Sequence, residues 1–310
     1  MNPVGIIGNF NLDIVVGGLE ARPAWDSEVM AEGYERRVAG TAGYMAMALQ
    51  ALGLQPVILS SIGQDSEGAY LLEELQRMDI PADGIVTLEN HQTPTSFVIV
   101  HKDGSRAIVS VLGAHHEFGN EMYKQKQHLL SSCEEVMICG NYLLPKFTVV
   151  DALEAAIEQK KQGKKIYFDP SWDPHGWKEA TKKNTLELIK HVDVCLLNET
   201  EICHLTAEDD WKKAIKILGN YCHEVVVKLG GKGAAALVDG EVHTVEGYQV
   251  PVVDTTGAGD TFDMGYLFAN RKAWPVEKKL DFANKMASII ISQESRETYP
   301  NLMVHLSEKM

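Results

Sequence analysis

Short apolar runs alternate with segments of helical periodicity from residue 134 onward, and this alternation restricts the fold more than any other feature. The apolar runs cover 136–139, 166–168, 192–197 and 225–229. The helical segments between them end at Gly163 or lie near 178–190 and 209–221. A strand that returns to its own sheet through a helix lies parallel to its neighbour, and such helices cover both faces of the sheet. The sequence therefore predicts an α/β fold with a central, mostly parallel sheet.

The first half of the chain supplies further strands and helices. Residues 4–8 and 57–63 are apolar runs that predict buried strands. Asp65 is placed to cap the next helix, whose apolar residues are Leu71, Leu72, Leu75 and Met78. Another helix is expected before Gly53, from the helical spacing of Met45, Ala48, Leu49 and Leu52.

Four segments have the features of exposed strands. Residues 14–16 and 27–38 are broken, partly alternating runs. Residues 96–100 and 106–111 flank Lys102-Asp103-Gly104-Ser105, a sequence typical of a hairpin turn. No low-complexity tract or long linker divides the chain, so we expect a single domain over residues 1–310.

Polar residues and glycines suited to ligand binding follow the predicted strands at their carboxyl ends. They are Asp13 soon after 4–8, Asp169 after 166–168, Asn198 after 192–197 and Gly230 after 225–229. Ligands of open α/β sheets bind at the edge formed by these strand ends. We therefore expect a ligand site along this edge.

The run from Val250 to Phe262, Val-Pro-Val-Val-Asp-Thr-Thr-Gly-Ala-Gly-Asp-Thr-Phe, is the most specific candidate site. Residues 250–253 predict the end of a strand, and helical spacing begins after Thr261. Between them lies Gly257-Ala258-Gly259, where backbone N–H groups at a helix start can converge on an anion. Asp260 follows in the first turn, where the helix dipole is expected to lower its pKa.

An anion-binding turn beside a carboxylate suits phosphoryl transfer, because the amides stabilise the moving phosphoryl group and the carboxylate accepts a proton. The alternative for an isolated Gly-x-Gly-Asp is an N-capping Asp in a glycine-rich turn. The full run resembles the signature of the ribokinase-type carbohydrate kinases, also called the PfkB family. These enzymes transfer the γ-phosphoryl group of ATP to a sugar or nucleoside hydroxyl. The resemblance implies that Asp260 is the catalytic base and that Gly257, Ala258 and Gly259 form the anion hole.

The resemblance covers roughly residues 4 to 300 and implies a ribokinase-like fold with a small β lid, formed by about 12–38 and 93–112. It implies that Asp13 binds the acceptor, although a turn cap is an alternative for this residue. Arg106 stands where a family arginine often reaches the site.

The family pattern Gly-Gly-x-x-x-Asn falls on Ala39, Gly40 and Tyr44. Gly40 therefore belongs to the implied acceptor site, and Tyr44 replaces the sugar-binding Asn. Its phenol could stack on a base or ring, or simply fill volume.

On the nucleotide side, Asn198 and Glu201 match the family's Asn-x-x-Glu, which organises Mg²⁺, through water, and the ATP phosphates. A solvated helix start is the alternative for this pair. Lys228, Gly230 and Gly233 fall in the nucleotide loop, where Lys228 replaces a Thr or Ser and could still pair with phosphate.

Two further contacts are implied by the resemblance. Asn284 matches an Asn beside the adenine, and Asp254 with Thr256 would line a site for a monovalent cation such as K⁺. Ser295 departs from the family, which has a glycine near this position.

Several other kinds of site are disfavoured by the sequence. Gly5 and Gly8 do not complete the Gly-x-Gly-x-x-Gly of a Rossmann dehydrogenase. The glycines at 230–233 continue into Ala234 rather than the Ser or Thr of a P-loop. His115 and His116 have no third ligand at a fitting spacing, which favours a role other than metal binding.

Two classes of function therefore compete. The first is an ATP-dependent kinase with Mg²⁺, acting on a sugar, sugar acid or nucleoside. The second is a catalytically weak ligand-binding or regulatory homologue, suggested by Tyr44, Lys228 and Ser295. The presence of both Asp254 and Asp260 with the Gly-Ala-Gly turn favours the kinase.

Composition limits the kinds of partner and the cellular compartment that we expect for this chain. A formal charge of −14 disfavours nucleic acid. The five cysteines show no Cys-x-x-Cys spacing, which favours reduced thiols in a cytoplasm. No basic region precedes the first apolar stretch, as it would in a signal peptide, and no run reaches the ~18 apolar residues of a membrane span. We expect a small-molecule acceptor, no membrane partner and a homodimer through the lid.

Overall fold

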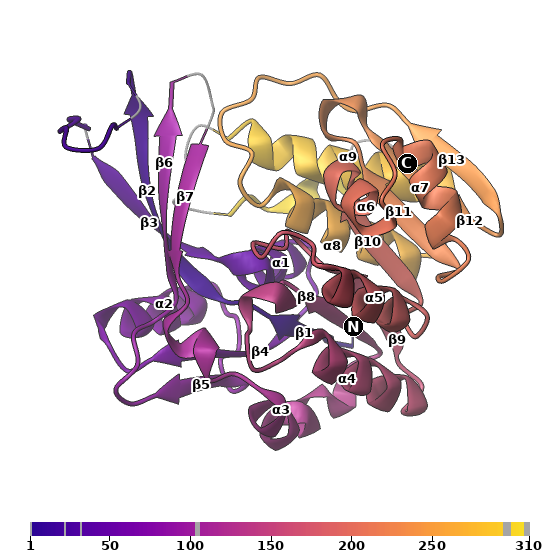
Figure 1. Ribbon diagram of the computed structural model, residues 1–310, viewed down its shortest axis with the longest axis horizontal. Helices are drawn as coiled ribbons and strands as arrows, with labels where there is room; N and C mark the ends of the chain where they lie inside the picture. The colour runs from indigo at the N-terminus through magenta and orange to yellow at the C-terminus, as the bar shows by residue number, and fades with distance from the viewer. Residues whose placement is uncertain (1, 22, 32, 103–105, 294–298, 307–310) are drawn as a thin grey trace.

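The computed structural model describes residues 2–21, 23–31, 33–102, 106–293 and 299–306. A nine-stranded sheet forms its centre, in the order β13-β12-β11-β10-β9-β8-β1-β4-β5 (Figure 1). The strands are β1 (Val4–Gly8), β4 (Pro56–Gly63), β5 (Ile85–Leu88), β8 (Glu135–Cys139), β9 (Lys165–Asp169), β10 (Val194–Asn198), β11 (Glu224–Lys228), β12 (Ala234–Val238) and β13 (Glu241–Val245). Neighbours from β5 to β11 are parallel, and β12 pairs antiparallel with both β11 and β13. This confirms the predicted mostly parallel sheet.

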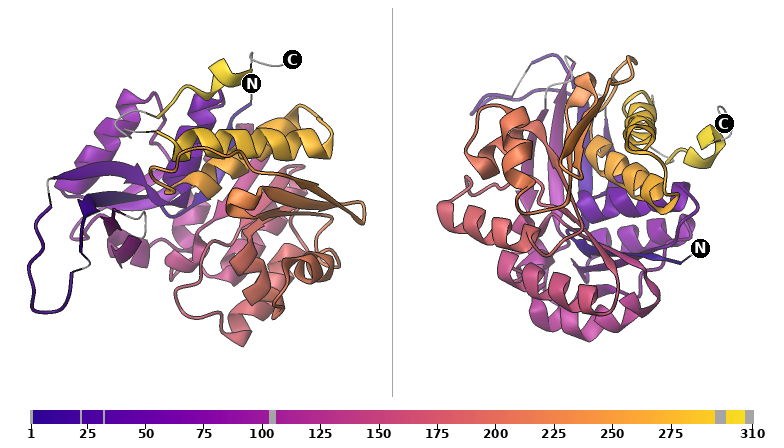
Figure 2. Two further views of the ribbon diagram at one scale, coloured as in Figure 1. Left: turned by 90° about the horizontal axis from the view of Figure 1, so that it is seen from above. Right: turned by 90° about the vertical axis from the view of Figure 1, so that its right-hand side faces the viewer.

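Helices cover both faces of the sheet (Figure 2). One face carries α1 (Gly40–Ala51), α2 (Ser66–Arg77), α8 (Ala258–Arg271) and α9 (Val276–Ile291). The other carries α3 (Asn120–Lys126), α4 (Val149–Lys161), α5 (Glu179–Ile189), α6 (Glu199–Thr206) and α7 (Trp211–Leu218). Successive strand residues point to opposite faces, so Ile6 packs in the first core and Ile7 in the second.

A second sheet of four strands, in the order β3-β2-β6-β7, projects from the main body (Figure 1). Its strands are β2 (Asn11–Leu19), β3 (Tyr34–Ala39), β6 (Thr95–His101) and β7 (Arg106–Val111). We call this sheet the lid. The predicted hairpin joins β6 and β7, which pair antiparallel, and residues 103–105 of its turn lie outside the described residues.

The strand expected within 27–38 begins only at Tyr34, and the strand predicted at 250–253 is wrong. Residues 246–257 form neither helix nor strand, and Val252 and Val253 are exposed. The valines have high β-propensity, but no strand among the described residues pairs with them. Instead Val253 N–H donates to Ile291 O at the end of α9 (2.8 Å). The segment is a connection from the β12–β13 hairpin, which the sequence did not predict, to α8.

Candidate active site

Three neighbouring strands end together at the carboxyl edge of the sheet. Asp169, Asn198 and Lys228 are the last residues of β9, β10 and β11, and Asn198 is directly opposite Lys228 in the parallel register. Their side chains therefore meet at one edge. This confirms the placement of Asp169 and Asn198 expected from the sequence.

Lys228 is surrounded by carboxyl groups from two elements. Its Nζ lies 2.8 Å from Oδ2 of Asp169 and 3.0 Å from both carboxyl oxygens of Asp263 on α8. Burial alone would lower the pKa of Lys228, but the charges of Asp169 and Asp263 raise it well above its ordinary value. Lys228 is therefore a buried ammonium bound to protein carboxylates. The sequence had suggested a phosphate partner for it.

The Gly-Ala-Gly turn opens α8, with Gly257 as the N-cap at φ +75° and Asp260 in the first helical turn. A Cβ atom at Gly257 would lie 2.6 Å from Cδ1 of Tyr44, so both the backbone conformation and the packing require glycine. At Gly259 the nearest atom to such a Cβ is Nζ of Lys228, at 3.6 Å. The turn thus lies between Tyr44 and the Lys228 ammonium.

The predicted pKa of Asp260 is wrong. Burial, followed by the charge of Asp169, raises its pKa to about 8, and Lys228 only partly opposes this. The helix dipole acts on this carboxyl too, but the loss of hydration is the larger effect here.

The neighbouring acids show the same competition between burial and charge. Burial and the Asp169 charge raise the pKa of Glu201 to about 7, and burial raises that of Asp263 well above 3.8. Burial would also raise the pKa of Asp169, yet the Lys228 charge and hydrogen bonds with Asp263, Lys228 and Ser171 lower it. Four acids thus share one ammonium. We call Asp169, Glu201, Lys228, Asp260 and Asp263 the acid cluster.

The acid cluster fits a hard divalent cation. It provides carboxylate oxygens, which Mg²⁺ prefers, and more acid groups than Lys228 can neutralise. Within the described ranges no three His, Cys, Asp or Glu side chains converge as a metal-ligand set. Any Mg²⁺ here would take most of its ligands from water and phosphate, as the sequence reasoning for Glu201 assumes.

Asn198 and Glu201 also have a structural role. Glu201 N–H donates to Asn198 Oδ1 and Asn198 N–H donates to Glu201 Oε2, both at 2.8 Å, which forms a capping box at the start of α6. Glu201 is buried, so the alternative of a solvated helix start does not describe it.

Asp13 is buried on β2, where it lies next to Tyr44 of α1. Asn11 Nδ2 donates to its Oδ1 (2.8 Å), and the Tyr44 hydroxyl lies 3.4 Å from its Oδ2. Burial raises the pKa of Asp13 to about 6, partly offset by these hydrogen bonds. Sequence reasoning missed Asn11, although its spacing of two from Asp13 on a strand places both side chains on one face.

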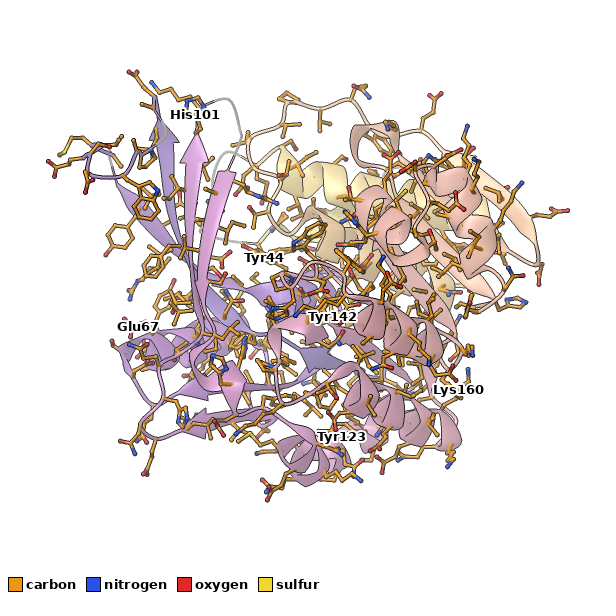
Figure 3. The ribbon with its side chains drawn as sticks, in the orientation of Figure 1. Tyr44, Glu67, His101, Tyr123, Tyr142 and Lys160 are labelled. Carbon is orange, nitrogen blue, oxygen red and sulfur yellow. The ribbon has the colours of Figure 1, made fainter. Side chains whose placement is uncertain are left out.

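Gly40 begins α1 directly beside this group. Its φ is +78°, and a Cβ atom there would lie 2.6 Å from Asn11 Oδ1. Tyr44, one turn later, is buried between the lid and the start of α8 (Figure 3). Its ring fills volume against Gly257, as one of the two alternatives expects, and its hydroxyl points to Asp13. Stacking of the phenol on a ligand ring stays a prediction.

We call the Gly-Ala-Gly turn, residues 257–259, the anion turn. Two lid arginines contact residues 254–256, directly before it. Arg37 Nη1 on β3 lies 2.5 Å from Asp254 Oδ2, and Arg106 Nη1 on β7 donates to the hydroxyls of Thr255 (3.1 Å) and Thr256 (2.8 Å). Arg106 therefore reaches the site region, as expected. Arg37 was not anticipated, and its positive charge occupies one side of the proposed monovalent-cation site at Asp254.

The nucleotide-loop residues lie next to each other in space. Gly230 and Gly233 bracket a short 3-10 turn after β11, at φ +59° and +102°. Asn284 Nδ2 on α9 donates to Glu246 O (3.3 Å), in the segment after β13. Ser295 lies outside the described residues. The two glycines and Asn284 border the end of the sheet beyond the acid cluster.

His115 has a structural partner. Phe10 N–H donates to its Nε2 (3.2 Å), and burial lowers the pKa of its imidazole to about 3, so it is neutral. It fixes the backbone between β1 and β2, immediately before Asn11.

The chain is similar to known proteins over nearly its whole length. The family described as pfkB family carbohydrate kinase matches residues 6–301. The chain is 24% identical over 301 residues to a ribokinase of Haemophilus influenzae, covering 94% of this chain and 93% of that one. It is 25% identical over 261 residues to a nucleoside kinase of Methanothermobacter thermautotrophicus, with coverage of 84% and 80%.

Solved structures share the fold at low identity. Arabidopsis thaliana ribokinase complexed with ribose and ATP superposes with a TM-score of 0.82 at 23% identity, covering 100% of this chain and 99% of that one. An E. coli chain assigned as ribokinase II, in complex with ATP and Mg²⁺, gives 0.85 at 22% identity and coverage of 99% and 98%. Adenosine kinase from Sinorhizobium meliloti gives 0.83 at 23% identity, with 98% of each chain covered. The fold is therefore ribokinase-like.

Proposed function

Because this chain belongs to the pfkB family of carbohydrate kinases, we propose that it transfers the γ-phosphoryl group of ATP to a hydroxyl of a sugar, a sugar acid or a nucleoside. One observation carries this proposal. Asp260 comes directly after the glycine turn whose amides begin α8, and desolvation with the charge of Asp169 raises its pKa to about 8. A proton acceptor beside the backbone N–H groups of a helix start is what this transfer requires.

In the proposed reaction the acceptor hydroxyl gives its proton to an oxygen of Asp260. The acceptor oxygen forms a bond to the γ-phosphorus, the bond from that phosphorus to the β-phosphate oxygen breaks, and ADP leaves. The amides of the Gly-Ala-Gly turn stabilise the negative charge on the transferring group. Mg²⁺, when bound beside Glu201, would neutralise phosphate charge and favour the ionised form of nearby carboxyls.

The proposed acceptor side consists of Asp13, Gly40, Tyr44 and Arg106, and we add Asn11 because it donates to Asp13 Oδ1. Asp13 accepts hydrogen bonds, has no ion-pair partner among the described residues, and so offers oxygens to ligand hydroxyls. Asp13→Ala should raise the acceptor KM and leave ATP affinity nearly unchanged. An equal loss of ATP affinity would contradict this assignment.

The nucleotide side is formed by Asn198, Gly230, Gly233 and Asn284. These residues border the acid cluster at the end of the sheet where the loops are glycine-rich. The solved relatives named above bind ATP in the same fold. Isothermal titration with ATP and Mg²⁺ tests this half of the proposal independently of turnover.

The proposed site for a monovalent cation is formed by Asp254 and Thr256. Arg37 already supplies a positive charge to Asp254. If K⁺ also binds, replacing KCl with an equal ionic strength of NaCl should lower kcat.

The experiment that tests the function is a coupled assay for ADP release with Mg²⁺ and ATP, run against a panel of sugars, sugar acids and nucleosides. We expect acceptor-dependent ADP formation with a small group of related acceptors. ATP binding without turnover on any of them would instead support the catalytically weak homologue.

A further inference from the structure

The side chain of Lys228 is enclosed by carboxyl groups, which its place in the nucleotide loop does not explain. It ends β11, and its ammonium contacts Asp169 on β9 and Asp263 on α8. Among the described residues no other Lys or Arg forms an ion pair with Asp169, Glu201, Asp260 or Asp263. One buried cation therefore serves the whole acid cluster.

The ammonium of Lys228 lies next to the anion turn. Its Nζ is 3.6 Å from where a Cβ atom of Gly259 would be, and Asp260 is the next residue. Asp263 is three residues after Asp260, about one helical turn, so it lies on the same side of α8. The contact of Lys228 with Asp263 thus joins the second turn of α8, directly after the turn that carries Asp260, to the end of the sheet.

We propose that Lys228 is a positioning residue for phosphoryl transfer, which holds the anion turn over the strand ends and adds a fixed positive charge beneath it. It acts through the turn and through Asp260 and does not touch the substrate. The inference rests on the proposed function, since only a reaction that gathers negative charge at the turn benefits from this cation. A charge fixed in place before the reaction stabilises such a transition state at no cost of reorganisation.

A purely structural role is the competing explanation. Buried ion pairs are often retained without contributing to activity, and removing one partner destabilises the fold because the other charge is left unpaired. The chain contains a matched example on the same strand. Glu224 begins β11 and pairs with the buried Lys279 of α9 (3.2 Å), at the opposite edge of the sheet from the acid cluster.

Three variants separate the two explanations. Lys228→Gln removes the charge. Lys228→Gln combined with Asp169→Asn removes the charge together with the carboxylate whose pKa that charge lowers, and the new amide at 228 retains a donor for Asp263. Lys279→Met removes the comparable buried ammonium outside the site. For each variant, Tm and steady-state constants are measured with the acceptor that the panel identifies, and kcat is expressed per folded protein.

If Lys228 positions the turn, Lys228→Gln should lower kcat by ~100-fold, comparable to the loss of one anion-hole donor, with the ATP KM changed less than about tenfold. The double variant should regain at least half of the lost Tm and keep the low kcat. Lys279→Met should lose Tm and keep its kcat. A double variant with kcat within about threefold of wild type would show that the ion pairs are only structural. Wild-type protein that turns over no acceptor would overturn the proposed function itself, and this inference with it.

Discussion

At the residue scale, Asp260 carries the largest predicted effect. Asp260→Asn retains the size of the side chain and much of its hydrogen bonding, but it cannot accept a proton. We expect kcat to fall by ~10²–10⁴, which is about 3–5 kcal/mol of barrier. ATP affinity should change less than about tenfold, because the anion turn binds through backbone amides. Pre-steady-state and steady-state rates with the true acceptor test this. A kcat within about threefold of wild type would remove the base from the mechanism.

The pH dependence of activity follows from the raised pKa of the same residue. Below its pKa of about 8, Asp260 in the free enzyme binds a proton and cannot take one from the acceptor. The value of kcat/KM should therefore decrease as the pH falls from about 9 to about 6. An unchanged profile over this interval would contradict the assignment.

The ionisation of Asp260 has the opposite effect on stability, which should decrease as the pH rises. The folded pKa of about 8 exceeds the ordinary 3.8, so Asp260 favours the folded state at low pH, and this contribution is lost as the pH rises through 8. Without nucleotide or Mg²⁺, Asp260→Asn should therefore raise Tm relative to wild type at about pH 9 and leave it similar near pH 4. Thermal unfolding at the two pH values measures the difference. A Tm gain of equal size at both would rule out this electrostatic origin.

At the element scale, the anion turn depends on a glycine for two separate reasons. Gly257→Ala forces a Cβ atom onto the Tyr44 ring at φ +75°. We expect at least a ~100-fold loss of kcat, because the turn amides move, and a loss of about 1–3 kcal/mol in stability. Gly163→Ala is the matched control, since Gly163 has φ +81° but no neighbouring atom within 4 Å and lies after α4. It should cost stability and leave kcat unchanged.

The start of α6 combines a structural and a proposed chemical role in Glu201. Glu201→Gln keeps an oxygen that can accept the Asn198 N–H, so the capping box survives while the charge is lost. We expect the Mg²⁺ concentration needed for half-maximal activity to rise about tenfold or more, with Tm nearly unchanged. Titration of activity with Mg²⁺ measures this. A titration that matches wild type would show that Glu201 only caps α6.

The elements themselves follow closely from local sequence, and the exceptions have physical causes. The strands ending at Asp169 and Asn198, and the cap at Asp65, which accepts from Gly68 N–H at 2.8 Å, appear where apolar runs and capping residues place them. The strand predicted at 250–253 is wrong because valines form a strand only if another strand lies beside them, which depends on tertiary structure. The lowered pKa predicted for Asp260 is wrong for a similar reason, because the desolvation that raises it is not visible in local sequence.

At the scale of the whole molecule, the contacts that complete the candidate site join distant parts of the chain. Arg37 and Asp254 are 217 residues apart, and Arg106 and Thr256 are 150 apart. Lys228 meets Asp263 across 35 residues. Such pairings depend on how the lid and α8 meet the sheet, and no periodicity encodes them. The motif at 257–260 is predictable from sequence because its chemistry is contained within four consecutive residues.

The outer face of the lid carries exposed apolar residues on three of its strands. Tyr34, Phe97, Val109 and Val111 lie on the face opposite Asp13 by strand register, and all are exposed. Exposed apolar faces of sheets are commonly covered in oligomers. A second copy of this chain, paired through the lid, would bury them and hold β2 and β6, and with them Asp13, more firmly over the acceptor site.

This arrangement predicts the mass in solution. Sedimentation equilibrium should give about twice the 34.3 kDa of the chain. Val109→Asp, at a residue that is 60% exposed on the lid, should shift the protein to a monomer and raise the acceptor KM. Val252→Asp adds the same charge at a residue that is 61% exposed but lies outside the lid, so it should remain dimeric. A wild-type monomer at all concentrations would disprove the lid dimer, whereas the proposed chemistry at Asp260 would stand, because the described residues of one chain supply that site.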